Sequence, residues 1–297
     1  FFLENRLMTQ FGLLMFATEY AVAPQVLAQQ AEMYGFESLF LPEHTHIPAS
    51  RKSPWPGGAE LPKEYWHTFD PFIALTMAAS VTQRLKLGTG ISLVTERDPI
   101  LMAKQVASLD HLSDGRLVLG IGAGWNAEEM ENHGTPFARR WPILRERTLA
   151  MREMWCQEEP EFHGEFVDFD KIWCYPKPKQ AGGPPILMGA SSRYTYDRIA
   201  EYADGWMPIY QNRARRQASG GVDYAAGIAK TKEAWQARGR KGSPQFSIFG
   251  VGADRRAVAE LVELGFDRVI FSLPSDAADV VLPLLEKYAS IAHEFTS

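Results

Sequence analysis

The sequence has few cysteines, no excess of basic charge and no long apolar run. Its 297 residues include only Cys156 and Cys174, which show no metal-binding spacing and cannot form a disulfide framework. We therefore expect a reducing compartment, the cytoplasm. The formal net charge of −5 argues against broad nucleic-acid binding, because that needs a basic face.

No apolar run approaches the roughly 20 residues that a membrane-spanning helix needs, so we expect no membrane span. The opening segment FFLENRLM is broken by Glu4 and Arg6 and makes a poor signal peptide. Because a strand-like run starts at Met8, we treat residues 1–7 as an N-terminal extension without an assigned role. We expect residues 8–297 to form a single domain.

Short apolar runs alternate with helical patterns along the whole chain. The expected strands lie at 10–16, 38–44, 85–92, 116–123, 186–190, 205–210, 246–251 and 268–274. The expected helices lie at 23–35, from 70, from 98, and at 138–157, 192–203, 224–238, 254–264 and 277–294. Near-continuous apolar strands suit a parallel sheet buried on both faces. Eight strand–helix units predict a (β/α)8 TIM barrel, with a doubly wound open sheet as the alternative.

Two features refine this prediction. The segments EMYGFESLFLP and VELGFDRVIFSLP form a weak repeat of helix, C-cap glycine, phenylalanine and strand, which favours the barrel. Insertions at 45–66, after the second strand, and at 160–185, before the fifth, interrupt the rhythm, and loops of such length are usually functional or disordered. We expect the second to hold a hairpin. Trp55, Tyr65 and Trp66 of the first are candidates for a lid over an apolar substrate.

In the stretch GRLVLGIGAGWNAEEM, three closely spaced glycines lie on and at the end of the expected fourth strand. Gly120, Gly122 and Gly124 give GxGxG, which lacks the third glycine of a dinucleotide fingerprint, and we expect no helix immediately after them. A Rossmann site is therefore disfavoured. The glycines either let a flat group lie against the backbone or fit a crowded barrel interior, and we favour the second explanation for Gly120.

Longer segments carry a family resemblance. The run from GRLVLGIGAGWNAEEM to LRERTLAMREMW resembles the luciferase-like monooxygenase superfamily, and LKLGTGISLVTERDPILMAKQVASLDHLSDGR, PPILMGASSRYTYDRIAEYADGW and FGVGADRRAVAELVELGFDRVIFSLP fit the same family. Within it, the chain looks like the members that use the deazaflavin coenzyme F420. The resemblance implies a barrel, an oxidoreductase and a homodimer.

In such a barrel the active site lies at the C-terminal ends of the strands. This rule, together with the resemblance, gives the expected cofactor contacts: Gly90, Ile91, Ser92, Gly122, Gly124, Trp125, Asn126, Gly189, Ala190, Ser191 and Ser192. The resemblance implies that the turn at Ser191 and Ser192 holds the cofactor phosphate, with a lesser contact from Arg193 or Tyr194. A simple N-cap explains the two serines equally well.

The same resemblance implies a non-proline cis peptide bond between Gly90 and Ile91, in place of an ordinary strand end. Trp125 is expected either to line the cofactor or substrate pocket or to belong to the core. Arg213, Arg215 and Arg216 form a basic segment that suits the oligoglutamate tail of F420, although a solvated loop is the preferred interpretation.

His44 and Glu43, at the end of the second strand, are the expected catalytic residues. His44 is a candidate for a hydrogen bond to the cofactor ring or for proton exchange with the substrate, because imidazole titrates near neutral pH. Glu43 either orients it or is a solvated loop acid. A metal site at His44 and His46 is disfavoured, because the later strand ends ILMGA and VIFSLP supply no further ligands.

The sequence therefore favours an F420-dependent oxidoreductase that transfers hydride between the deazaflavin and a small organic substrate. The first alternative is an FMN-dependent monooxygenase that uses reduced flavin and oxygen. The second is a catalytically idle barrel that binds flavin or another small ligand.

Overall fold

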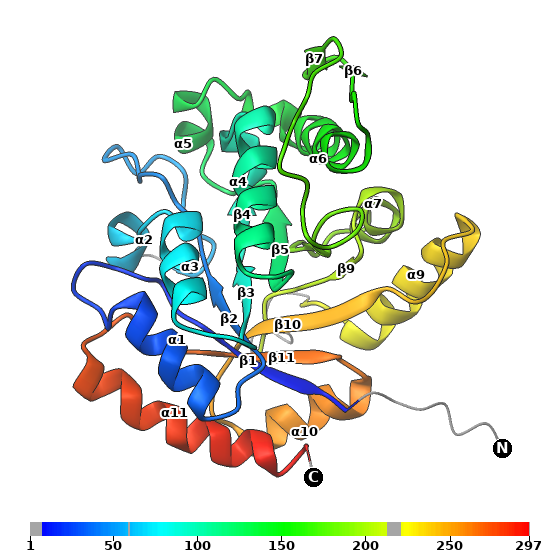
Figure 1. Ribbon diagram of the computed structural model, residues 1–297. Helices are drawn as coiled ribbons and strands as arrows, with labels where there is room; N and C mark the ends of the chain where they lie inside the picture. The colour runs from blue at the N-terminus through cyan, green and yellow to red at the C-terminus, as the bar shows by residue number, and fades with distance from the viewer. Residues whose placement is uncertain (1–7, 59, 213–220, 297) are drawn as a thin grey trace, which may run out of the picture.

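The computed structural model describes residues 8–58, 60–212 and 221–296. Its parallel strands close into a barrel with helices on the outside (Figure 1). The barrel strands are β1 (Gln10–Leu14), β2 (Ser38–Leu41), β3 (Lys86–Thr89), β4 (Ser92–Leu93), β5 (Leu117–Gly122), β8 (Ile186–Met188), β9 (Gly205–Trp206), β10 (Gln245–Val251) and β11 (Arg268–Ser272). They follow the order β3-β2-β1-β11-β10-β9-β8-β5-β4, and pairing of β3 with β5 closes the ring. The (β/α)8 barrel is confirmed and the open sheet is excluded.

The third expected strand is divided between β3 and β4. β3 pairs with β2, and β4 pairs with β5, so the two pieces together fill one position of the barrel. The interruption is the Gly90–Ile91 peptide bond, which is cis as the resemblance implied. The hairpin expected within 160–185 is also present, as the antiparallel pair β6 (Phe162–His163) and β7 (Asp168–Phe169).

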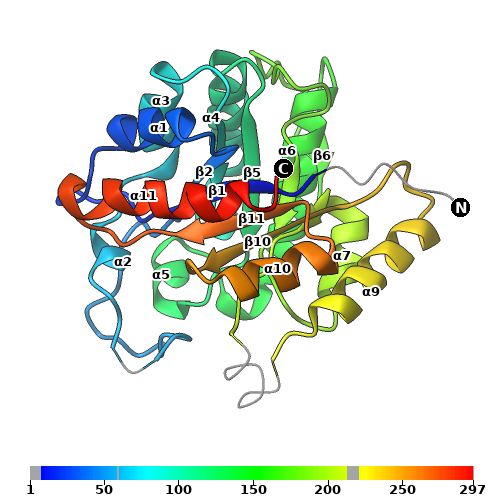
Figure 2. The same cartoon turned by 90° about the horizontal axis from the view of Figure 1, so that it is seen from below.

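Helices cover the outside of the barrel, as Figure 2 shows from below. The longer ones are α1 (Pro24–Met33), α3 (Pro71–Ser80), α4 (Pro99–Leu112), α6 (Arg140–Cys156), α7 (Thr195–Tyr202), α9 (Tyr224–Ala237), α10 (Arg255–Leu264) and α11 (Ala278–His293). Asp70 and Asp98 cap α3 and α4 through backbone N–H groups, and each is followed by proline. None of the helices in the described ranges has both the length and the apolar character needed to cross a bilayer.

The structure corrects two expectations about helices. The segment after Gly124 does form a helix almost at once, α5 (Ala127–Asn132), with Asn126 as its N-cap. Conversely, α7 starts at Thr195 with Tyr194 at the N-cap position, so neither Ser191 nor Ser192 caps it. Further short elements are α2 (Glu64–His67) and the 3₁₀ helices η1 (Val94–Glu96) and η2 (Phe137–Arg139).

The barrel interior is filled by side chains from facing strands. Its cluster comprises Leu14, Phe40, Val118, Leu187, Met207, Phe249 and Ile270. Gly120 belongs to this crowded interior, because a Cβ there would overlap the Thr89 carbonyl and the Met207 methyl group. This supports the packing explanation for Gly120. Because these side chains fill the barrel interior, a ligand site must lie at one end of the barrel.

At the N-terminal end of the barrel, a buried ion pair joins β11 to the start of β2. Arg268 donates from Nε and Nη2 to the two carboxylate oxygens of Glu37, both at 2.8 Å, and from Nη1 to Ser247 Oγ at 3.0 Å. Burial alone would raise the pKa of Glu37, but the guanidinium lowers it to about 2. This end of the barrel is therefore closed by paired charges.

Candidate active site

A cavity of about 530 Å³ opens at the C-terminal ends of the strands. Its volume falls within the range of roughly 300–1,000 Å³ that is usual for small-molecule and cofactor sites. Ten of the expected site residues line it: Glu43, His44, Gly90, Ile91, Gly124, Trp125, Gly189, Ala190, Ser191 and Ser192. The strand-end rule thus located residues from four separate parts of the chain around one space.

Three expected contact residues do not line the cavity, and each supports its wall. Ser92 donates its hydroxyl to Glu43 Oε2 at 2.5 Å. Gly122 makes room for Ile91, because a Cβ at position 122 would overlap Ile91 Cδ1. Asn126 accepts a hydrogen bond from the backbone of Glu129 at the start of α5. Their contacts are with the chain itself and not with the cavity.

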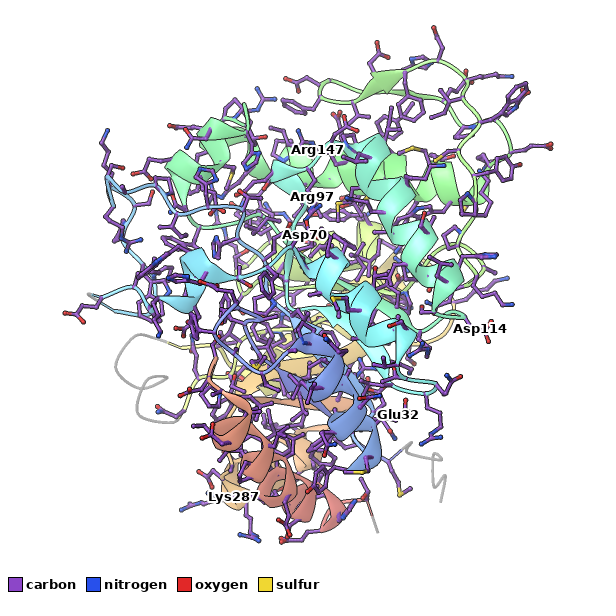
Figure 3. All side chains as sticks on the ribbon, turned by 60° about the vertical axis from the view of Figure 1, so that its left-hand side comes forward. Glu32, Asp70, Arg97, Asp114, Arg147 and Lys287 are labelled. Atoms are coloured by element: carbon purple, nitrogen blue, oxygen red, sulfur yellow. The ribbon has the colours of Figure 1, made fainter. Side chains whose placement is uncertain are left out.

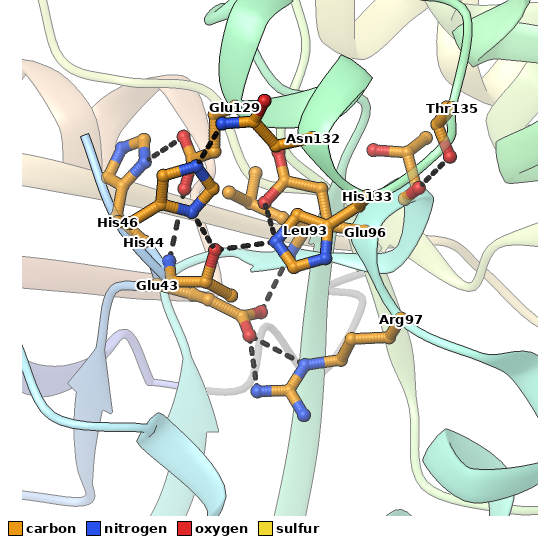
Figure 4. Close-up of polar contacts among 12 residues, drawn as sticks. Glu43, His44, His46, Leu93, Glu96, Arg97, Glu129, Asn132, His133 and Thr135 are labelled. Carbon is orange, nitrogen blue, oxygen red and sulfur yellow. Dashed lines mark hydrogen bonds and ion pairs between the residues drawn. The ribbon is translucent and has the colours of Figure 1, made fainter. Parts of the chain in front are cut away.

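His44 is fixed on the cavity wall by a partner that the sequence did not suggest. Its Nδ1 lies 2.7 Å from Glu129 Oε2, and both side chains are buried (Figure 4). Because a carboxylate only accepts, this contact places the hydrogen on Nδ1. Nε2 has no hydrogen-bond partner in the described chain, and the ring lies beside Tyr65 and Trp125 in the cavity lining. One ring nitrogen is thus held by the protein and the other remains available.

Glu129 is the functional residue that sequence reasoning missed. It lies on α5, is fully buried, and accepts from the Thr45 backbone N–H at 3.0 Å in addition to His44. The signal was present, because Asn126-Ala-Glu-Glu129 has the N-cap and N3 spacing of a capping box. It was overlooked because no helix was expected there.

The expectations for Glu43 were wrong. It neither contacts His44 nor meets solvent: its side chain is 1% exposed and forms an ion pair with Arg97. Oε1 accepts from Arg97 Nε at 2.6 Å, and Oε2 accepts from the Leu93 backbone N–H at 2.8 Å. Arg97 also reaches Asp70, the cap of α3, as their positions in Figure 3 show. Glu43 therefore braces β4 and the end of η1 at the cavity wall.

A third buried carboxyl group, Glu96 on η1, lies near Glu129 and Glu43. Burial and, to a smaller extent, the charges of the two neighbouring carboxylates raise its pKa to about 9. Its side chain is 1% exposed, and neither oxygen meets a donor in the described residues. Burial, the lack of donors among the described residues and the neighbouring negative charges all favour the protonated form of Glu96.

The insertion at 45–66 covers the cavity on one side. Tyr65 and Pro56 line it, and Trp55 packs edge-to-face on Tyr65 at 5.6 Å. Trp66 is 49% exposed and does not line the cavity, so its expected place in the lid is not confirmed. Glu128 of α5 accepts from the backbone N–H of Ser53 at 3.0 Å and from the Ser53 hydroxyl, which ties this cover to α5.

The turn between β8 and α7 presents polar backbone groups to the cavity. The N–H groups of Ala190 and Ser191 make no hydrogen bond within the described chain, and both residues line the cavity. Ser192 is held by Thr195, whose Oγ1 accepts from the Ser192 N–H at 2.9 Å. The turn therefore offers donors to an anionic group.

Two other expectations concern charge and metal. Arg213, Arg215 and Arg216 lie outside the described residues. Within the described residues no cluster of histidine, cysteine, aspartate and glutamate has the geometry to hold a metal ion. His46 instead contacts Thr45 and Asn132 at the surface.

Known proteins resemble this chain over most of its length. It is 38% identical over 283 residues to an uncharacterized protein of Mycobacterium tuberculosis, a match covering 94% of this chain and 97% of that protein. It is 29% identical over 243 residues to the F420-dependent hydroxymycolic acid dehydrogenase of Mycobacterium tuberculosis, a match covering 80% of this chain and 61% of that protein.

Two solved structures share the fold. The monooxygenase RslO1 from Streptomyces bottropensis has a TM-score of 0.77 at 19% identity, covering 97% of this chain and 98% of that one. An F420-dependent secondary alcohol dehydrogenase in complex with an F420-acetone adduct has a TM-score of 0.75 at 17% identity, covering 96% and 98%. The profile of the luciferase-like monooxygenase family matches residues 18–272, and the chain therefore belongs to this family of oxidoreductases.

Proposed function

We propose that this protein is an F420-dependent oxidoreductase that transfers hydride between the deazaflavin and a small organic alcohol, carbonyl compound or activated alkene. The observation that carries the proposal is the fixed His44. Its Nδ1 is held by Glu129 at 2.7 Å, whereas Nε2 meets no partner among the described residues and lies at a cavity lined mainly by apolar residues. Such an arrangement suits proton exchange with an oxygen atom that gains or loses negative charge.

The residues present fit this coenzyme. The unpaired N–H groups of Ala190 and Ser191, with the two serine hydroxyls, would hold its phosphate at the mouth. Gly90 and Ile91 would form the wall behind its ring. The relative named for F420 dependence matches 80% of this chain, which supports the deazaflavin over FMN. We also expect a homodimer, on the resemblance alone.

The coenzyme would supply the hydride acceptor or donor, and the chain supplies position and a proton. Neutral His44, with its hydrogen on Nδ1, has a lone pair on Nε2 and accepts a proton from an alcohol. Protonated His44 donates from Nε2 to a forming alkoxide, and Glu129 stabilises the imidazolium. Tyr65, Trp125 and the 45–66 cover exclude water around the reacting atoms.

Parallel fluorescence titrations of the purified protein with F420 and with FMN test the cofactor. We expect tight binding of F420 and weak binding of FMN. Turnover is then followed with F420 and 2-propanol, and with reduced F420 and acetone or cyclohexenone. Preference for FMN together with oxygen consumption would support the flavin monooxygenase instead.

Replacing the histidine tests its role. His44→Gln is expected to lower kcat by about 10²–10⁴-fold, the usual contribution of a general acid–base group, with F420 affinity unchanged. His163→Gln makes the same change in the exposed hairpin and serves as the matched control. Tight cofactor binding without turnover in either protein would instead favour an idle binding barrel.

A further inference from the structure

The geometry behind His44 points to a role for Glu96. We propose that Glu96 is a positioning residue for His44: it stays protonated, and its carboxyl O–H donates a hydrogen bond to the Glu129 carboxylate that holds the histidine ring. This inference rests on the proposed function of His44 and adds a residue that acts through Glu129, without touching substrate or cofactor.

The position of Glu96 supports such a role. A Cβ built on Gly124, a residue of the cavity wall, would lie 3.7 Å from Glu96 Oε1, so the carboxyl group sits directly behind that wall. Both of its oxygens are buried, and no donor in the described chain reaches them. An ionised carboxylate left without donors in the interior would be very costly, whereas a protonated carboxyl group is itself a donor.

Glu129 can accept that proton. Its two oxygens already accept one hydrogen bond each, from the Thr45 N–H at 3.0 Å and from His44 Nδ1 at 2.7 Å. A carboxylate has about four acceptor positions, so room for a third donor remains. Glu129 lies close enough to Glu96 for its negative charge to raise the pKa of Glu96. A proton between the two groups satisfies Glu96 and removes their mutual repulsion.

The surrounding charges leave no cation for an ionised Glu96. Arg97 is engaged by Glu43 and Asp70. Arg147 of α6 donates to the Val94 carbonyl. His133 comes nearer, with Nε2 4.0 Å from Glu96 Oε2, as the close-up shows (Figure 4).

His133 does not supply that cation at neutral pH. Burial, with a smaller contribution from His46, lowers the pKa of His133. The Glu96–Glu129 pair therefore holds one proton and one negative charge behind His44. At pH values below the pKa of Glu96, His44 faces a single carboxylate charge, that of Glu129, in a fixed orientation.

Infrared spectroscopy in D2O tests the protonation state without cofactor or substrate. At pH 7 we expect a carbonyl stretch of a protonated carboxylic acid that is lost in Glu96→Gln. Glu131→Gln, the same change at an exposed position of α5, should retain it. In the wild-type protein the band should disappear as the pH passes about 9. Absence of a Glu96-dependent band at pH 7 overturns the proposal.

The NMR signals of His44 test the coupling. With ¹⁵N-labelled histidine, assigned through His44→Gln, the wild-type His44 resonances should shift with an inflection near pH 9, when Glu96 ionises. Glu96→Gln should abolish this inflection, because an amide keeps an N–H donor towards Glu129 but cannot ionise. An inflection that persists in Glu96→Gln would contradict the role of Glu96.

Steady-state turnover distinguishes a positioning role of Glu96 from a role in packing alone. Glu96→Gln should keep kcat within a few-fold at pH 7 and extend activity to higher pH. Glu96→Leu, which removes the donor, should lower kcat by about tenfold or more with F420 affinity unchanged, as losses of supporting contacts commonly do. Equal activity of the two variants overturns the proposal. Full turnover of His44→Gln would contradict the proposed function of His44. The infrared band would still test separately whether Glu96 and Glu129 share a proton.

Discussion

Glu37 and Glu96 are both buried glutamates, and they lie at opposite ends of the same barrel. Glu37, at the N-terminal end, faces a bidentate arginine, and its pKa is lowered to about 2 despite burial. Glu96, at the C-terminal mouth, faces other carboxylates, and burial with their charge raises its pKa to about 9. The two side chains are only 14% and 1% exposed, and they favour opposite protonation states because their charged neighbours differ.

The contrast teaches what each end is built for. The Glu37–Arg268 pair stabilises the fold above pH 4.5, by about 3 kcal/mol for the shift to about 2, and this contribution is lost as the pH falls through the folded pKa. Glu96 acts in the reverse sense, because a raised pKa penalises folding as the pH rises. The Glu37–Arg268 pair at the N-terminal end stabilises the fold. Ionisation of Glu96 destabilises it at the C-terminal end, where the candidate site lies.

The largest effect should come from breaking the closed end. Arg268→Ala removes the buried partner of Glu37, leaves the half-exposed Lys86 beside it, and is expected to lower the free energy of unfolding by about 3 kcal/mol. Denaturant titration measures this loss, with Arg255→Ala at the exposed Arg255–Glu294 pair as the control. Below the unfolding transition, F420 affinity should be unchanged. If the two variants lose stability equally, the Glu37–Arg268 pair contributes no more to stability than the exposed Arg255–Glu294 pair.

A smaller effect should come from removing the free-energy cost of ionising Glu96 at the C-terminal end of the barrel. The Glu96 pKa is raised from 4.5 to about 9, so its stabilisation is complete below pH 4.5 and is lost as the pH rises through 9. Glu96→Gln cannot ionise and should become more stable relative to the wild type between pH 7 and 9. The gain should reach about 2–3 kcal/mol, since one proton changes stability by at most about 1.4 kcal/mol per pH unit.

The same denaturant titrations at pH 7, 8 and 9 check this difference, with Glu131→Gln as the control. A constant stability difference across that range would show that Glu96 carries no bound proton at pH 7.

The smallest effect should come from the cover of the cavity. Ser53→Ala removes the hydroxyl donor to Glu128, whose pKa this hydrogen bond lowers. We expect a loss of about 1 kcal/mol in the closed arrangement of the cover, the usual net worth of such a bond. Steady-state kinetics should show it as a several-fold rise in KM with kcat retained. A fall in kcat alone would mean that the cover positions the catalytic groups as well.

The sequence predicted most of the fold because the barrel strands are short, apolar and regularly spaced. Ten residues that line the cavity followed from the rule that active sites lie at strand ends, together with the resemblance. The pairing of His44 with Glu129 did not follow, because these residues are 85 positions apart and meet only when α5 folds over the C-terminal ends of the strands. Glu43 was misassigned because its proximity in sequence to His44 suggested a contact, whereas its carboxylate is engaged by Arg97 and by the backbone N–H of Leu93.

The glycines that first suggested a nucleotide fingerprint have a different consequence. A Cβ at Gly122 would overlap Ile91 Cδ1, and a Cβ at Gly189 would lie 2.6 Å from Ile91 Cγ2. Two neighbouring strands therefore form a socket for one side chain of the cavity wall. These three positions cannot vary independently: a larger residue in the socket requires a smaller one at position 91. Residues 91, 122 and 189 must therefore change together to alter the shape of this cavity wall. A single substitution that adds a side chain at position 122 or 189 would leave a steric overlap with Ile91.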